Sequence, residues 1–295
     1  MAINERLNAL YGALVADAAS MGMHWIYDQE HIKKVEETGD VLFRQPDSNT
    51  YEGVKSYFAH APKRVGEFSQ YGASAQVVAN VIKQNGNYDV SVHQALFFTT
   101  FGPCGSYHGF ADRPTKALVA RMIIDGDELP DASGSDDDQM PALVSVPALF
   151  GNSESVEALV SAVSVTNVHK DAISGARVLN DSLRRIFDGE TLSDALRNSA
   201  NSAETELAAL LNESLQHAEY KPLEIAQHFG MACHMKQGLP VVWHLLSHAK
   251  DYESVVRDNI RCGGDSCGRS MAVGAIAGLV FGIPESMSMK VPALL

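Results

Sequence analysis

Apolar residues recur every three or four positions through most of the chain, a spacing that predicts amphipathic helices. The first such segment runs from Ile3 through Leu14 toward Asp17. Three more cover residues 77–82, 117–122 and 173–187. We find no convincing series of alternating strands joined by hairpin turns. The pattern therefore predicts an all-α fold.

Residue types typical of helix ends lie where this periodicity stops. Gly86 follows the helix predicted around residues 77–82, and we interpret it as a helix C-cap rather than part of a hairpin turn. Gly189 ends the segment at 173–187. Thr191 with Asp194 resembles a capping box that opens the next helix.

The segment at residues 271–281 is apolar all round and rich in small residues, which predicts a helix buried in the centre of a bundle. Gly274 and Gly278 lie one turn apart and predict a close approach of a neighbouring backbone. Linker-like stretches occur at residues 45–51 and 125–135, but helical patterns continue on both sides. We therefore expect one large multi-helix domain over residues 1–295.

Composition narrows the classes of function. Of the 295 residues, 45% are hydrophobic and 20% are charged, which excludes disorder as the main state. The formal net charge of −13 disfavours nucleic acid and anionic membranes as partners. No apolar stretch reaches the roughly 18–20 residues that span a bilayer. The four cysteines are too few and too irregularly spaced for a disulfide framework, so we expect a cytoplasmic protein. The expected partner is a small molecule.

The first candidate cluster for chemistry follows the N-terminal helix. Asp17 stands at the expected end of that helix, and His24, Trp25 and Tyr27 follow. A carboxylate, an imidazole and two aromatic rings in so short a span could hold a ring-bearing ligand. A capped helix end with a partly buried tryptophan explains the same residues.

A second cluster is acidic and ends in Asp136, Asp137 and Asp138. Carboxylates at this density suit magnesium or calcium, although a solvated loop before a helix is the usual explanation of such a run. In a helix, successive residues point about 100° apart, so the three could not all face one ion. The other carboxylates of the segment are Asp125, Asp127, Glu128 and Asp131.

The third cluster precedes the small-residue helix and contains Gly263, Gly264, Asp265, Ser266 and Arg269. Paired glycines let a backbone pass close to a ligand, and a following helix N-terminus would offer free N–H groups to an anion. The Asp265 carboxylate could be a metal ligand or simply the helix N-cap.

Together these clusters resemble the motifs of the ADP-ribosylglycohydrolase superfamily, an all-α fold with a magnesium-containing cleft. Residues 12–18 resemble its GAxxGDA segment, 165–169 its VTHxxP segment, and 263–266 the start of GGDTDT. The helix at 272–278 is similar to IAGAxxGA. Elements at 24–28, 71–75 and 136–139, with Arg269 after GGD, resemble the J-crystallin-like branch.

The chain departs from the hydrolase motifs at positions where the family places metal ligands. The TDDT motif falls on residues 72–75, which contain no carboxylate. A family glutamate falls on His24, the second aspartate of GGDTDT falls on Cys267 and its last threonine on Gly268. Only Asp265 is clearly retained, so the resemblance implies at most one magnesium ion.

The resemblance implies hydrolysis of an ADP-ribosyl or related glycosidic bond at a reorganised site. The metal would be held by Asp265 and a carboxylate of the acidic run, and His24 would act as general base or orient the ribose. The expected catalytic residues are His24, Asp137 and Asp265. The expected metal ligands are Asp136, Asp137, Asp138 and Asp265. The expected ligand-binding residues are Asp17, Trp25, Gly263, Gly264, Ser266 and Arg269.

The competing hypothesis is a catalytically silent relative that binds nucleotides or serves as a crystallin-like structural protein. Under the enzyme hypothesis, His24 and Asp265 should face the same cleft although they lie far apart in the sequence.

Overall fold

A computed structural model describes residues 2–126 and 130–292 of the chain. Across these ranges fifteen α-helices follow one another, and the only β-type pairings found are three isolated bridges. The predicted all-α fold is therefore confirmed. Within the same ranges, no helix is both long and apolar enough to cross a membrane.

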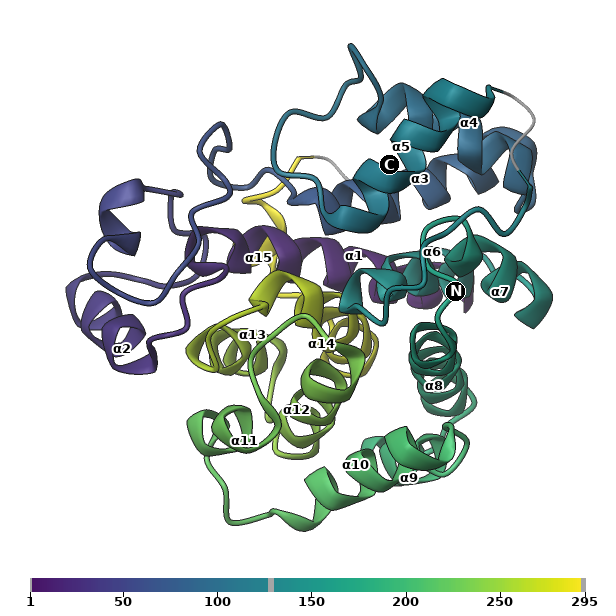
Figure 1. The fold of residues 1–295 in the computed structure, drawn as a ribbon. Coiled ribbons are helices and arrows are strands. Elements are labelled where there is room, and N and C mark those ends of the chain that lie inside the picture. Colours follow the sequence, from purple (N-terminus) through teal and green to yellow (C-terminus); the bar gives the residue numbers. More distant parts are fainter. Residues whose placement is uncertain (1, 127–129, 293–295) are drawn as a thin grey trace.

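The helices are joined by loops and three short 3₁₀ turns (Figure 1). The first eight are α1 (Ala2–Ser20), α2 (Gln29–Thr38), α3 (Gln70–Asn85), α4 (Val90–Phe101), α5 (Arg113–Asp125), α6 (Ser145–Gly151), α7 (Val156–Ser164) and α8 (Lys170–Phe187). The remainder are α9 (Leu192–Ala200), α10 (Thr205–Gln216), α11 (Pro222–Phe229), α12 (Met235–Ser247), α13 (Tyr252–Arg261), α14 (Ser266–Phe281) and α15 (Glu285–Ser288). The 3₁₀ turns are η1 (Met21–Met23), η2 (Ser48–Tyr51) and η3 (Met140–Val144).

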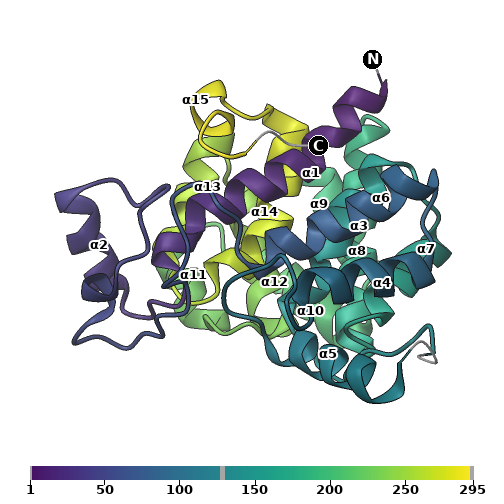
Figure 2. The ribbon, with the colours of Figure 1, turned by 90° about the horizontal axis from the view of Figure 1, so that it is seen from above.

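Helices α1 and α14 lie side by side at the centre of the molecule (Figures 1 and 2). A Cβ atom on Gly12 would collide with the carbonyl oxygen of Gly274, and a Cβ on Gly274 would collide with that of Gly12. Gly278 faces the Asn8 carbonyl in the same way. The predicted close backbone approach at Gly274 and Gly278 is confirmed, and α1 is the helix that makes it.

Replacing Gly274 by leucine should therefore lower the free energy of unfolding by about 1–3 kcal/mol or more, because overpacking forces the two backbones apart. Urea unfolding of Gly274→Leu measures the change. The matched control is Gly39→Leu, since a Cβ at Gly39 meets nothing closer than the Arg44 guanidinium at 3.4 Å. An unfolding midpoint equal to that of the parent would contradict the packing described.

Helix α1 is longer and more deeply buried than its sequence pattern predicts. It continues to Ser20, so Asp17 lies within the last turn of the helix and does not end it. Residues 12–20 are all buried, because α14, α6 and α3 pack around them. The prediction of an amphipathic helix ending at Asp17 is corrected accordingly.

Most predicted helix ends are confirmed. Gly86 ends α3 in the left-handed region, with φ of 81°. The Thr191 hydroxyl accepts a hydrogen bond from the Asp194 N–H at the start of α9. The small-residue helix predicted at 271–281 is α14, which begins earlier, at Ser266.

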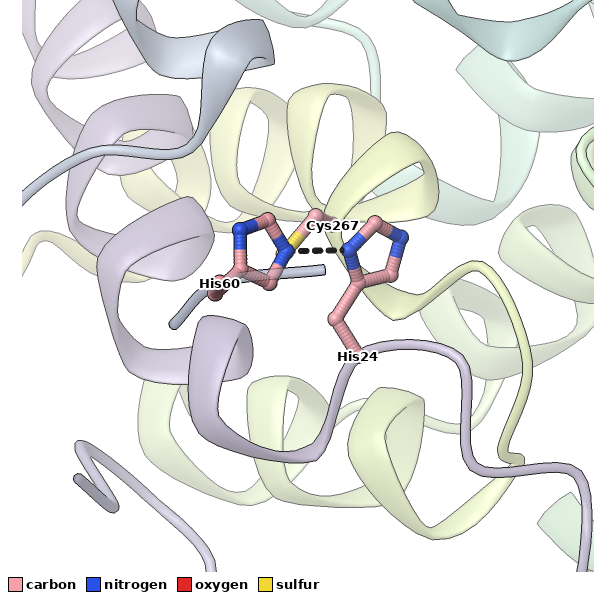
Figure 3. A group of neighbouring side chains, drawn as sticks. All are labelled: His24, His60 and Cys267. Carbon is pink, nitrogen blue, oxygen red and sulfur yellow. Dashed lines mark hydrogen bonds between the residues drawn. The ribbon is translucent and has the colours of Figure 1, made fainter. Parts of the chain in front are cut away.

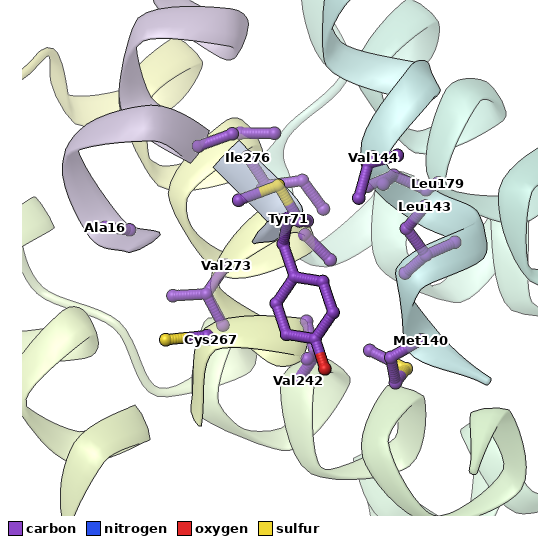
Figure 4. Close-up of a cluster of buried hydrophobic side chains, with 14 of the residues drawn as sticks. Ala16, Tyr71, Met140, Leu143, Val144, Leu179, Val242, Cys267, Val273 and Ile276 are labelled. Atoms are coloured by element: carbon purple, nitrogen blue, oxygen red, sulfur yellow. The ribbon is translucent and has the colours of Figure 1, made fainter. Parts of the chain in front are cut away.

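The remaining helices surround the central pair. Helices α3, α4 and α5 form one side, whereas α8 to α12 form the other (Figure 1). Tyr71 of α3 points into the core, where Val273 of α14 and Leu143 of the η3 turn lie around it (Figure 4). Most buried apolar side chains form one main cluster, and a second cluster contains Phe97 of α4 and Leu118 and Met122 of α5. The extent of a single domain over residues 1–295 stays a prediction.

Candidate functional site

The turn after α1 and the loop before α14 are joined by backbone hydrogen bonds. The Trp25 N–H donates to the Gly264 carbonyl at 2.8 Å, and the Gly264 N–H donates to the Ile26 carbonyl at 2.7 Å. Gly264 has φ of +64°, and a Cβ there would collide with the Met231 carbonyl. Only glycine allows this close approach, which fixes the two segments against each other.

This junction brings His24 and Asp265 into direct contact. His24 Nε2 lies 2.8 Å from Asp265 Oδ1, and the two side chains are 1% and 0% exposed. Asp265 also caps α14, since its side chain accepts a hydrogen bond from the Gly268 N–H. The two residues therefore lie together as predicted, whereas a shared ligand cleft stays a prediction.

A second histidine extends the contact. His24 Nδ1 lies 2.8 Å from His60 Nε2, and His60 is 1% exposed (Figure 3). His60 belongs to the irregular segment between η2 and α3, where no periodicity marks it, and sequence analysis missed it. The result is a buried hydrogen-bonded chain that runs from Asp265 through His24 to His60.

The protonation of this chain follows from burial. Burial lowers the pKa of His24, against the opposing effect of Asp265, and lowers the pKa of His60 well below its usual value. With both rings neutral, we assign the His24 Nε2–H as donor to the carboxylate and the His60 Nε2–H as donor to His24 Nδ1. His60 Nδ1 then carries a free lone pair, and this buried atom has no hydrogen-bond partner in the described part of the protein.

Aromatic rings connect the buried chain with the surface. The Trp25 ring stacks on His24 with centroids 4.0 Å apart, and Phe110 meets Trp25 edge-on at 4.9 Å. Tyr57, whose ring centroid is 5.6 Å from that of Trp25, is 55% exposed. Trp25 itself is held at φ of +64°, a strained value for a side chain of this size.

Asp17 lies in the same region, on the last turn of α1. Its carboxylate accepts hydrogen bonds from the Ser69 N–H at 2.8 Å and the Ser69 hydroxyl at 2.5 Å. Burial raises the pKa of Asp17 to about 6, although these hydrogen bonds oppose the shift. The Cys267 thiol lies 3.7 Å from the Asp17 carbonyl oxygen.

The N–H groups around the paired glycines donate hydrogen bonds within the protein. In addition to Gly264, the Asp265 N–H donates to the Met231 carbonyl at 3.0 Å and the Ser266 N–H to the Gly264 carbonyl at 2.8 Å. These donors stabilise the loop itself, and an anion site at the N-terminus of α14 stays a prediction.

Arg269 has a structural role in the same loop. Its guanidinium donates to the Asn259 side-chain oxygen at 2.8 Å and to the Gly263 carbonyl at 2.6 Å. The side chain is fully buried, and its hydrogen bond to Gly263 holds the backbone of the paired glycines in place. The ligand-binding roles of Gly263, Ser266 and Arg269 stay predictions.

The acidic run is not helical, and its three carboxylates do not converge on one position. Asp136 is exposed, Asp137 pairs with Arg113 and Ser135, and the Asp138 carboxylate lies 2.8 Å from His234 Nδ1. The hydrogen bonds to Asp137 outweigh its partial burial and lower the pKa of this carboxyl group. Asp127 and Glu128 lie outside the described residues.

Comparison with known proteins identifies the family of this protein. The sequence model of the ADP-ribosylglycohydrolase family matches residues 3–292. The chain belongs to the ADP-ribosylglycohydrolase family. The resemblance predicted from the motifs is confirmed.

Similar proteins include two crystallins from Tripedalia cystophora. Crystallin J1A is 23% identical, with 93% of this chain and 87% of that protein covered. Crystallin J1B is 21% identical with the same coverage. A solved structure described as an "ADP-ribosylglycohydrolase-related protein complex" superposes with a TM-score of 0.69 at 14% identity, over 98% of this chain and 94% of that one. This likeness shows that the fold is shared.

The metal-ligating side chains gathered here do not suit the magnesium implied by the family resemblance. Within the described ranges, two groups of at least three His, Cys, Asp or Glu ligand atoms are close enough to hold one ion. One is His24, His60 and Cys267 (Figure 3); the other is Glu213, His217 and His228. Neither contains Asp265 or the acidic run, and magnesium prefers oxygen ligands to imidazole and thiol. The predicted magnesium ligands therefore do not come together as one such group.

Proposed function

We propose that this family member hydrolyses an ADP-ribosyl or related glycosidic bond, with the chain from His60 through His24 to Asp265 as the proton acceptor. The carrying observation is the buried hydrogen-bonded chain itself. Burying two imidazoles and a carboxylate is unfavourable unless their hydrogen bonds are satisfied. Buried titratable groups linked in this way are frequent at functional sites.

In this proposal the attacking water loses a proton to His60 Nδ1, the free acceptor of the chain. The water oxygen bonds to the anomeric carbon, the bonding electron pair departs with the leaving group, and the leaving group afterwards receives the proton that His60 took up. The His60 Nε2–H moves toward His24, whose other nitrogen is held by Asp265, so the carboxylate stabilises the positive charge that develops. A positioned base of this kind typically contributes about 10²–10⁴-fold to a rate.

The aromatic residues support the same proposal. Tyr57, Phe110 and Trp25 lead from an exposed ring to the ring that stacks on His24. Aromatic faces suit stacking against a nucleobase or the apolar face of a sugar. In a ligand bound this way, the glycosidic bond would lie on the Trp25 side of the three hydrogen-bonded residues His60, His24 and Asp265.

One observation favours a second function, that of a crystallin-like structural protein. His24, His60 and Asp265 are each at most 1% exposed, as expected for a polar network that only stabilises a core. The similar proteins named crystallins agree with this alternative.

The two proposals differ in a direct assay. The purified protein is mixed with an ADP-ribosylated peptide, and released ADP-ribose is followed by chromatography, with calorimetry for binding of ADP-ribose. Enzymatic function requires release above the rate of the heat-denatured protein. If the protein neither binds ADP-ribose nor releases it from the peptide, the result supports the structural alternative and overturns the hydrolase proposal.

A further inference from the structure

Three metal-ligating side chains meet where α10 ends and α11 ends, outside the site described above. Their ligand atoms, from Glu213, His217 and His228, all lie within 4.8 Å of one another. Glu213 Oε1 is 2.8 Å from His228 Nε2 and 3.6 Å from His217 Nε2. We propose that this group binds a divalent transition-metal ion of the zinc class.

The helices place these side chains together. Glu213 and His217 are four residues apart at the end of α10, so they lie on one side of the helix. His228 comes from the last turn of α11. Between them, the Tyr220 ring stacks on the His217 ring with centroids 4.4 Å apart, which limits the orientations that the imidazole can adopt.

The surroundings of His217 match those of a zinc ligand. Its Nδ1 faces Glu219 Oε1 at 3.5 Å, while its Nε2 faces the proposed ion position. A metal-bound imidazole commonly turns its second nitrogen to a carboxylate, which fixes the tautomer and the ring orientation. Among the described residues His217 Nε2 is buried without a hydrogen-bond partner, so it can ligate an ion in the tautomer that carries the ring proton on Nδ1.

Two further histidines hold the connecting loop in place. His244 Nε2 of α12 lies 3.0 Å from the Tyr220 carbonyl, and His248 Nε2 lies 3.2 Å from the Ala218 carbonyl. Both contacts anchor the segment that carries His217 and Glu219. The backbone between α10 and α11 is therefore held in place before an ion arrives, which lowers the entropic cost of binding.

The chemistry of the ligands selects the ion. Two imidazole nitrogens and one carboxylate are a common ligand set for zinc, with the fourth position left to water. Magnesium would require oxygen ligands. Glu213 and His217 are 43% and 22% exposed and His228 is 37% exposed, so an ion can enter from solvent. The carboxylates of Glu213 and Glu219 balance the charge of a divalent cation.

The test is calorimetric titration of the chelator-treated full chain with zinc chloride. We expect one zinc ion per chain at this group and a higher melting temperature when zinc is present, because the ion binds only the folded state. His228→Gln and Glu213→Gln should each weaken this binding at least tenfold. Circular dichroism checks that both variants are folded, and their side chains are exposed enough that folding should be preserved.

The matched control is His234→Gln. His234 pairs with the Asp138 carboxylate at 2.8 Å, as His228 does with Glu213, but no second histidine completes a group there. Zinc affinity should be unchanged in this variant. The proposal is overturned if both test variants bind zinc as the parent does, or if binding is lost in His234→Gln instead. Because binding is measured directly, neither outcome depends on hydrolytic activity.

Discussion

His24→Gln should lower the rate of glycosidic hydrolysis, at most by the roughly 10²–10⁴-fold that a positioned general base contributes, because His60 loses the partner that stabilises its positive charge. Glutamine keeps a polar side chain of similar length. Unlike an imidazole, its amide cannot accept a proton from His60 while it donates another to the Asp265 carboxylate. The chain would therefore stop at His60, which would lose the charge stabilisation behind it. Initial rates of ADP-ribose release from an ADP-ribosylated peptide measure the effect.

The control for this variant is His93→Gln. His93 is another buried histidine, at 3% exposure, but it lies on α4 beside Tyr88 and Phe97 and not in the hydrogen-bonded chain. Its loss should leave the rate unchanged. If both variants hydrolyse the substrate as fast as the parent, the proposed proton acceptor is wrong.

Asp265→Asn provides a separate test of the same chain. An asparagine amide can donate a hydrogen bond to His24 Nε2, which would move the imidazole proton to Nδ1. The His24 Nδ1–H and the His60 Nε2–H would then point at each other. Either His60 changes its tautomer, or the hydrogen bond between the two rings is lost. The expected rate loss is of the same order as for His24→Gln, and NMR of the imidazole nitrogens would show the change of tautomer.

Sequence periodicity was sufficient to predict the fold class and the close helix contact. The small residues around Gly274 predict a buried helix regardless of which helix packs against it. Such a composition is favourable only where another backbone approaches closely. The identity of that neighbour, α1, depends on contacts across more than 250 residues of sequence, and no local pattern specifies them.

The site was predicted in part, for a related reason. His24 and Asp265 belong to recognisable motifs, and their contact was expected. His60 was missed because it lies in an irregular segment and reaches His24 only through tertiary packing. The sequence could not show that the N–H groups of Gly264 and Asp265 are engaged, because their acceptors, on Ile26 and Met231, are distant in sequence.

Acid sensitivity of the fold should depend in part on His93. Burial lowers the pKa of His93 to about 4, whereas an unfolded histidine titrates near its usual 6.5. Between these values the unfolded chain binds a proton that the folded chain excludes. The contribution of His93 to stability is therefore fully present above pH 6.5 and is lost as the pH falls toward 4. A shift of this size corresponds to roughly 3 kcal/mol.

His93→Gln removes this titration while keeping a polar side chain near the Tyr88 hydroxyl, which lies 3.0 Å from His93 Nδ1 in the parent. Between pH 7 and pH 4 the variant should lose about 3 kcal/mol less unfolding free energy than the parent. Urea unfolding at both pH values measures this difference, and the exposed His108→Gln serves as control. Other titrating groups, including Asp17, are common to both proteins and cancel in the comparison. Equal losses in His93→Gln and the parent would mean that the imidazole is protonated without cost in the folded chain, against the burial observed on α4.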